Sequence, residues 1–70
     1  MDWKSILKKT ADGFERQAEE CEKAAKGFRD DPNFAKHYGS GWVDLKAEEL
    51  HRMASWFRSQ AAEVRTKISN

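Results

Sequence analysis

The sequence is poor in the residues that cross-link small proteins or bind metals. It has one cysteine, Cys21, and two histidines, His37 and His51, among 70 residues. A single cysteine excludes an internal disulfide framework, and these three residues lack the paired close spacing of zinc ligands. A chain this short lies near the lower limit for an independent hydrophobic core and needs a further source of stability. Because no disulfide, metal or cofactor is indicated, we expect self-association to supply it.

The sequence also lacks an excess of one charge and any long apolar run. Thirteen basic and twelve acidic residues give a formal net charge of +1, which provides no global attraction to nucleic acid or anionic lipid. No apolar run approaches the length of a membrane span, and residues 1–4 do not begin a signal-peptide core. We therefore expect a cytoplasmic protein.

The residues that are abundant favour helix, since the chain has much Ala, Glu, Lys and Arg and only one proline. Two stretches, 2–29 and 42–69, carry apolar residues in steps of three and four, the spacing of a helix seam. In each seam alanine recurs at every seventh position. The first seam comprises Leu7, Ala11, Phe14, Ala18, Cys21, Ala25 and Phe28. The second comprises Val43, Ala47, Leu50, Ala54, Phe57, Ala61, Val64 and Ile68.

The two seams match when the chain folds back on itself. In one register every level pairs alanine with alanine or bulky with bulky, for example Ala18 with Ala54 and Phe14 with Phe57. This agreement between local pattern and global pairing favours a single 1–70 domain, an all-α, antiparallel two-helix hairpin. Two unrelated amphipathic helices are the alternative.

The connection, residues 30–41, has turn signals of its own. Asp31 before Pro32 is typical of an N-cap followed by the first residue of a helix, so a short helical turn is expected there. Gly39 is suited to end this turn in a left-handed conformation, and Ser40 is suited to be the N-cap of the second long helix.

One flank of the predicted hairpin is apolar and the opposite flank is charged. At 100° per residue, the apolar flank gathers Ile6, Trp42, Leu45, Met53 and Trp56. A seam that is half alanine buries little area, because only large side chains contribute about 1.5–3 kcal/mol each. Two exposed tryptophans would also leave a large apolar patch on a small monomer. We therefore expect two hairpins to pack through this flank as a homodimeric four-helix bundle.

No combination of residues suggests catalysis. Cys21 lies in the seam, where free cysteine behaves as a small hydrophobe, and the adjacent carboxylates Glu20 and Glu22 disfavour its reactive thiolate form. His51 lies opposite Glu22 in the register and is better explained as a surface ion-pair partner than as a general base. We expect neither enzymatic activity nor a cofactor.

Aromatic and cationic residues gather around the connection. Tyrosine, tryptophan and arginine are the residue types that dominate binding hot spots. Phe34 and Trp42 are suited to cap the open end of the core, whereas Tyr38 precedes a Gly-Ser-Gly segment and is harder to bury. The candidate contacts with a partner protein are Arg29, Lys36, His37 and Tyr38.

In its length, hairpin form and Arg29…Tyr38 tip, the whole chain resembles the small phage-encoded quorum-sensing anti-activators. The resemblance implies a dimeric helical hairpin that acts in the cytoplasm of the host cell. It further implies binding to a LuxR-type transcription activator of the host and to a pilus-assembly ATPase. Arg29 and Tyr38 are the positions to which partner contacts would be assigned.

Three functions remain open from the sequence. The first is a protein-binding inhibitor or adaptor that sequesters a host regulatory protein. The second is a nucleic-acid-associated regulator, including an inhibitor of an RNA-guided nuclease, although its candidate basic residues are interleaved with acids. The third is a structural dimerisation module.

Overall fold

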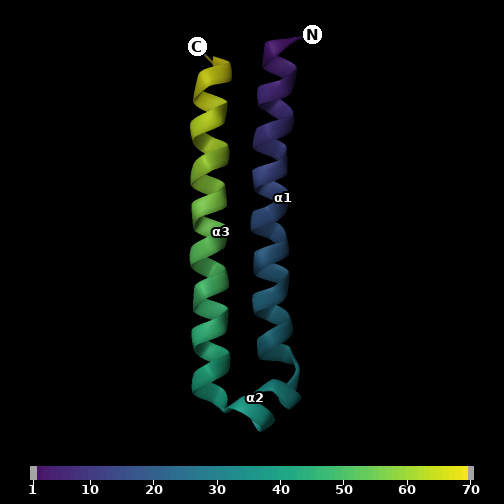
Figure 1. Cartoon of the computed structure of the whole chain (residues 1–70), viewed down its shortest axis with the longest axis vertical. Helices are drawn as coiled ribbons and strands as arrows, with labels where there is room; N and C mark the ends of the chain where they lie inside the picture. Colours follow the sequence, from purple (N-terminus) through teal and green to yellow (C-terminus); the bar gives the residue numbers. More distant parts are fainter. Residues whose placement is uncertain (1, 70) are drawn as a thin grey trace.

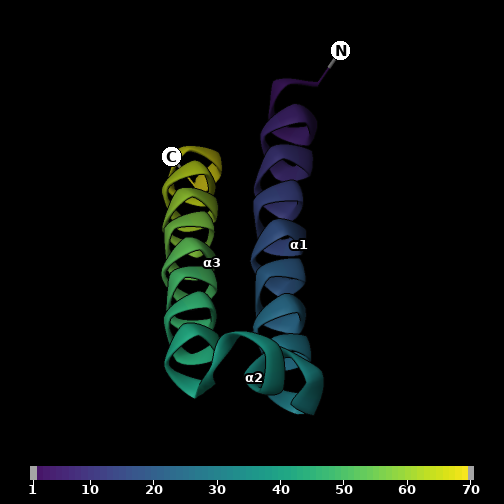
Figure 2. The same cartoon turned by 60° about the horizontal axis from the view of Figure 1, so that its bottom comes forward.

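Two long helices joined by a short one make up the structure. The computed structural model describes residues 2–69 as α1 (Trp3–Asp30), α2 (Pro32–Tyr38) and α3 (Ser40–Ser69). α1 and α3 lie side by side and run in opposite directions (Figure 1), and α2 lies across their ends (Figure 2). The molecule measures 51 × 16 × 12 Å. The predicted all-α class is confirmed, and no strand occurs within residues 2–69.

Aspartates and a proline set the ends of the first two helices. α1 begins after Asp2, whose carboxylate caps the first turn. α1 ends at Asp30 because Asp31 precedes Pro32, and the residue before a proline disfavours the helical conformation. Asp31 is extended, and its side chain accepts a hydrogen bond from the Asn33 N–H at 3.0 Å. Asp31 is therefore the N-cap of α2 and Pro32 its first residue, as the sequence predicts.

A single residue, Gly39, separates α2 from α3. Its φ of 92° is positive, as expected, but its ψ of 154° is extended rather than left-handed helical. Residues with side chains disfavour such a φ, so the position suits glycine. The predicted N-cap, Ser40, is instead the first residue of α3, because the Gly39 carbonyl already accepts a hydrogen bond from the Val43 N–H at 3.3 Å. α3 therefore begins two residues before the predicted start at 42.

Small residues form the buried seam between α1 and α3. The buried residues are Ala11, Ala18, Cys21, Ala25, Val43, Ala47, Ala54 and Ala61. Among the larger side chains, the Phe14 and Phe57 rings lie 6.2 Å apart, and Leu50 packs against the cluster around Cys21. No large side chain within residues 2–69 is fully buried. The helices therefore approach closely, but the seam removes little apolar surface from water.

Candidate functional site

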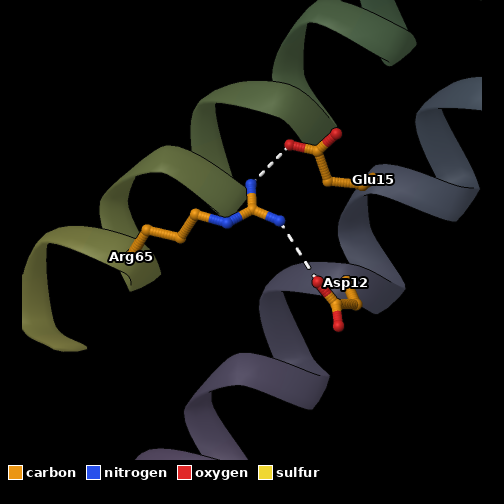
Figure 3. A network of polar contacts seen from close by, with 3 residues as sticks. All are labelled: Asp12, Glu15 and Arg65. Atoms are coloured by element: carbon orange, nitrogen blue, oxygen red, sulfur yellow. Dashed lines mark hydrogen bonds and ion pairs between the residues drawn. The ribbon is translucent and has the colours of Figure 1, made fainter.

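Ion pairs join α1 and α3 along one side of the seam. Arg65 donates hydrogen bonds to Glu15 and, at 3.2 Å, to Asp12 (Figure 3). The Glu22 carboxylate lies 3.0 Å from Nδ1 of His51 and 3.3 Å from Arg58. The α1 residues in these pairs are acidic and the α3 residues are basic, so every pair links one helix to the other. We call this surface the charged side.

These contacts shift two pKa values. The hydrogen bond with His51 is the largest cause of a lowered pKa at Glu22; partial desolvation opposes it and the bond with Arg58 reinforces it. The hydrogen bond with Glu15 raises the pKa of the Arg65 guanidinium above its already high value. Each of these side chains is at least 36% exposed, so water and salt screen the pairs. The charged side is thus a solvated surface that contributes little to stability.

The described residues provide no cluster of metal ligands. Within residues 2–69, no three His, Cys, Asp or Glu side chains come together in a way that could hold a metal ion. Cys21 is buried in the seam, and His51 is engaged by Glu22. In the same part of the chain, no helix combines the length and the apolar character needed to cross a membrane. Two surfaces remain as candidate binding sites, the side opposite the ion pairs and the bend.

The side of the seam opposite the ion pairs carries exposed apolar side chains. Ile6 is 36% exposed, Met53 49% and Trp56 55%; Leu45, which is 63% exposed, lies at the outer edge of this side, because it is two residues from both Val43 and Ala47 of the seam. The Trp56 ring touches the core at one edge, since it lies 6.3 Å from the Phe14 ring in an edge-to-face arrangement. The remainder of this surface is uncovered, and an exposed apolar patch on so small a chain is a candidate interaction surface. We call it the apolar side.

Four aromatic rings pack together at the bend. The Phe28 ring lies 4.8 Å from the Phe34 ring and 5.6 Å from the Trp42 ring, both in edge-to-face arrangements. Tyr38 stacks on Trp42 with ring centroids 4.4 Å apart, yet it is 61% exposed. The Lys46 ammonium lies 5.8 Å from the Trp42 ring, within cation–π range. We call these four rings, which link all three helices, the bend cluster.

The residues predicted to contact a partner lie on different parts of the bend. Tyr38 belongs to the bend cluster, the His37 ring lies 6.4 Å from it, and Lys36 is exposed on α2. Arg29 is exposed on α1, where it lines a hollow that also includes His51 of the charged side. No cation–π contact within residues 2–69 joins Arg29 to Tyr38. The structure therefore places the His37 ring beside Tyr38, whereas Arg29 lies in the hollow that includes His51.

Sequence reasoning missed two features of the bend. The first is Lys46 over Trp42, for which the four-residue spacing on one helix is a usable signal. The second is an apolar hollow lined by Ala24, Gly27, Phe28, Asp31 and Phe34. The hollow depends on how α2 crosses the end of α1, which no periodicity encodes. Trp42, which the sequence assigns both to the apolar flank and to the core cap, is half-buried within the bend cluster.

Comparison with known proteins assigns the chain to no family. No protein-family model matches it. No curated protein and no solved structure matches it either. Function is therefore inferred from the apolar side and the bend cluster.

Proposed function

We propose that this protein is a non-catalytic, protein-binding inhibitor or adaptor that works as a homodimer of helical hairpins. Each copy uses its apolar side to bind the second copy and its bend to bind a partner protein. The observation that carries the proposal is Tyr38, which is stacked on Trp42 and still 61% exposed. An exposed aromatic ring held in one orientation is a typical anchor of a protein–protein interface, because little entropy is lost on binding.

The thin seam supports the proposed self-association. Six of its eight buried residues are alanine, and alanine contributes only a small part of the roughly 1.5–3 kcal/mol of a large buried side chain. Ordering each residue costs about 1–2 kcal/mol of backbone entropy. Covering Leu45, Met53 and Trp56 with a second copy adds the apolar burial that the seam lacks.

The resemblance to the phage quorum-sensing anti-activators narrows the proposed partner. It points to a LuxR-type transcription activator, with a pilus-assembly ATPase as a second host protein, and to action in the host cytoplasm. Arg29 and Tyr38 are then the contact residues. Because Arg29 lies toward the charged side and Tyr38 on the bend cluster, a partner that touches both covers the end of the molecule and not one of its long sides.

Affinity capture with matched variants tests the use of the bend. Tagged wild-type, Tyr38→Ala, Arg29→Ala and Thr66→Ala proteins are incubated with host lysate, and captured proteins are identified by mass spectrometry. We expect the wild-type protein to capture a partner that Tyr38→Ala does not capture. Thr66→Ala, altered at the far end of α3, is the control and is expected to capture it. Circular dichroism and light scattering check that all variants stay helical and dimeric. Retention of the partner by both bend variants would contradict the proposal.

Purified components test the identity of the partner. We expect the wild-type protein to release a LuxR-type activator from its DNA in a gel-shift assay, and Tyr38→Ala to be inactive. Direct binding to a mixed DNA and RNA pool, with an affinity that falls steeply with salt, would instead favour the nucleic-acid-associated function.

A further inference from the structure

Two glycines within α1 have no role in the packing of a single copy. α1 runs unbroken through Gly13 and Gly27, although each costs about 1 kcal/mol relative to alanine in a helix. Neither has a positive φ, and a Cβ added at either position would meet nothing within 4 Å. Neither conformation nor contacts within the copy therefore require glycine. A helical glycine of this kind suits the close approach of another chain.

Both glycines lie on the apolar side. Gly13 precedes Glu15 by two residues, about 200° around the helix, so it lies across the seam from the ion pair of Glu15. Gly27 follows Gly13 by about four turns and shares its face. On α3, Trp56 precedes Arg58 by the same two-residue step and lies on the same side of the molecule. Apart from Ile6 near its start, α1 thus presents mainly small apolar residues on this side, and α3 presents large ones.

One large residue of α3, Leu45, lies at the level of a small residue of α1. Phe14 and Phe57 lie at the same height along the two helix axes, which we call a level. Because the helices are antiparallel, each residue further along α1 toward the bend is at the level of one residue earlier in α3. Leu45, which is 63% exposed, is thus within one residue of the level of Gly27. The apolar hollow at this level is lined by Ala24, Gly27, Phe28, Asp31 and Phe34. A Leu45 side chain from a second copy has the size and the apolar character to enter it.

Two twofold axes can bring the apolar sides of two copies together. An axis perpendicular to the helices places α1 on α1 and α3 on α3, so that each helix meets its own copy in reverse order and the bends lie at opposite ends. An axis parallel to the helices places α3 of each copy on α1 of the other and keeps every residue at its own level. The parallel axis thus brings the large residues of α3 onto the helix that carries Gly13 and Gly27.

We propose the arrangement with the parallel axis, in which both bends lie at the same end of the dimer. Leu45 of each copy enters the hollow beside Gly27 of the other copy, and Trp56 packs between Gly13 and Gln17 of the other copy. This inference rests on the proposed dimer and specifies its geometry. It gives both helical glycines a function that a single copy does not.

Charged residues at the outer edge of the apolar side complement each other in this arrangement. The parallel axis places residues of α1 in one copy beside residues of α3 in the other copy at the same level, within one residue. Three of these neighbouring pairs carry opposite charges. The three pairs are Glu20 with Arg52, Lys23 with Glu49, and Lys9 with Glu63. Such complementarity favours one register over others more than it adds affinity. The perpendicular axis does not preserve these levels.

The face that carries the apolar side is long enough for a stable dimer interface. The outline of the molecule, 51 Å by 16 Å, limits this face to roughly 800 Å² on each copy, which is the size typical of a specific interface. With both bends at one end, two copies of Tyr38 lie near each other. A dimeric partner is then bound through two bends at once, which raises the apparent affinity without new contacts.

Distances between spin labels distinguish the two arrangements. The label is attached to Asn33→Cys on α2 in a Cys21→Ala background that keeps the dimer mass in light scattering. Bends at the same end give a distance within roughly 30 Å, because packed helices are about 10 Å apart and the molecule is 16 Å wide. Bends at opposite ends give a distance near the 51 Å length of the molecule. A label at Thr66→Cys, at the far end, is likewise expected to give a short distance.

Each outcome of this measurement is decisive. Short distances at both sites support the parallel axis. A dimer with long distances overturns the arrangement and leaves the proposed dimer standing. A protein that gives no intermolecular distance and the mass of one copy overturns the proposed dimer and the arrangement together.

Substitution of the glycines tests the same inference in the chain with its native Cys21. We expect Gly13→Leu and Gly27→Leu each to raise the dimer dissociation constant at least tenfold, measured by analytical ultracentrifugation. Gly41→Leu is the matched control, since Gly41 is also helical, lies off the apolar side and has nothing within 4 Å of an added Cβ. Dimerisation of both variants as tightly as Gly41→Leu would overturn the arrangement.

Discussion

The ring of Tyr38 lies against the ring of Trp42, with centroids 4.4 Å apart and ring planes inclined by 27°. Trp42 is held in turn by the edge of Phe28 at 5.6 Å and by Lys46. The exposed Tyr38 ring, at the end of α2, is therefore supported directly by α3 and, through Trp42, by α1. In the proposed function, this support sets the orientation of the ring before a partner binds and so reduces the entropy lost on binding.

Replacing Trp42 by alanine tests this support. Replacing a completely buried tryptophan by alanine lowers the free energy of unfolding by about 3–5 kcal/mol. Because Trp42 is half-buried, we expect a decrease of about 2 kcal/mol. Affinity for the partner is expected to fall at least tenfold, because Tyr38 loses its stacking surface. Denaturation at fixed protein concentration and titration with the partner measure the two effects. Asn33→Ala, at an exposed α2 position, is the control, and unchanged affinity in Trp42→Ala would contradict a supporting role.

The helices and the seam were predictable because their signals are local and periodic. Alanine at every seventh position of two stretches places Phe14 against Phe57, and their rings do lie 6.2 Å apart. The Asp31-Pro32 pair marks the start of α2. The start of α3 was wrong by two residues because the extended ψ of Gly39 lets Ser40 enter the helix directly.

The bend was less predictable because it depends on how α2 lies across the other two helices. Periodicity along α3 assigns Trp42 to the apolar flank, whereas the rings that surround Trp42 include Phe34 and Tyr38 of α2. Arg29 and Tyr38 are close in the sequence, but the end of α1, Asp31 and most of α2 separate them. No rule of residue spacing predicts the direction in which the seven-residue helix α2 crosses the ends of α1 and α3.

Enlarging a seam alanine tests the close approach of the helices. Ala54 is fully buried, and Ala54→Leu inserts three carbon atoms where no space exists. We expect a decrease of about 3 kcal/mol in the free energy of unfolding, at the upper end of typical overpacking effects. Ala62→Leu, at an exposed position of α3, is expected to change it by less than about 0.5 kcal/mol. Equal effects in chemical denaturation would show that the seam is not closely packed.

The charged side predicts a dependence of stability on pH. The pKa of Glu22 is lowered in the folded chain, so its ionised form favours folding. Its contribution is fully present above the ordinary carboxyl pKa of 4.5 and is lost as the pH falls through the lowered folded-state value. Glu22→Gln is therefore expected to lower Tm slightly at pH 7 and to leave it unchanged at about pH 2, where both forms are neutral. Glu19→Gln is the control, and an equal decrease at both pH values would point to packing instead of charge.

The apolar side is tested by making its largest residue polar. Trp56 is 55% exposed, and a central tryptophan of an interface typically contributes about 2 kcal/mol or more to binding. We expect Trp56→Gln to raise the dimer dissociation constant about thirtyfold, which corresponds to 2 kcal/mol at roughly 1.4 kcal/mol per factor of ten. Because Trp56 also contacts Phe14, circular dichroism at high concentration checks that the helices persist. Tyr38→Gln is the control, because it removes an exposed aromatic ring at the bend instead. We expect it to leave the dimer dissociation constant unchanged in sedimentation velocity. If the two variants dimerise equally well, the copies associate through a surface other than the apolar side.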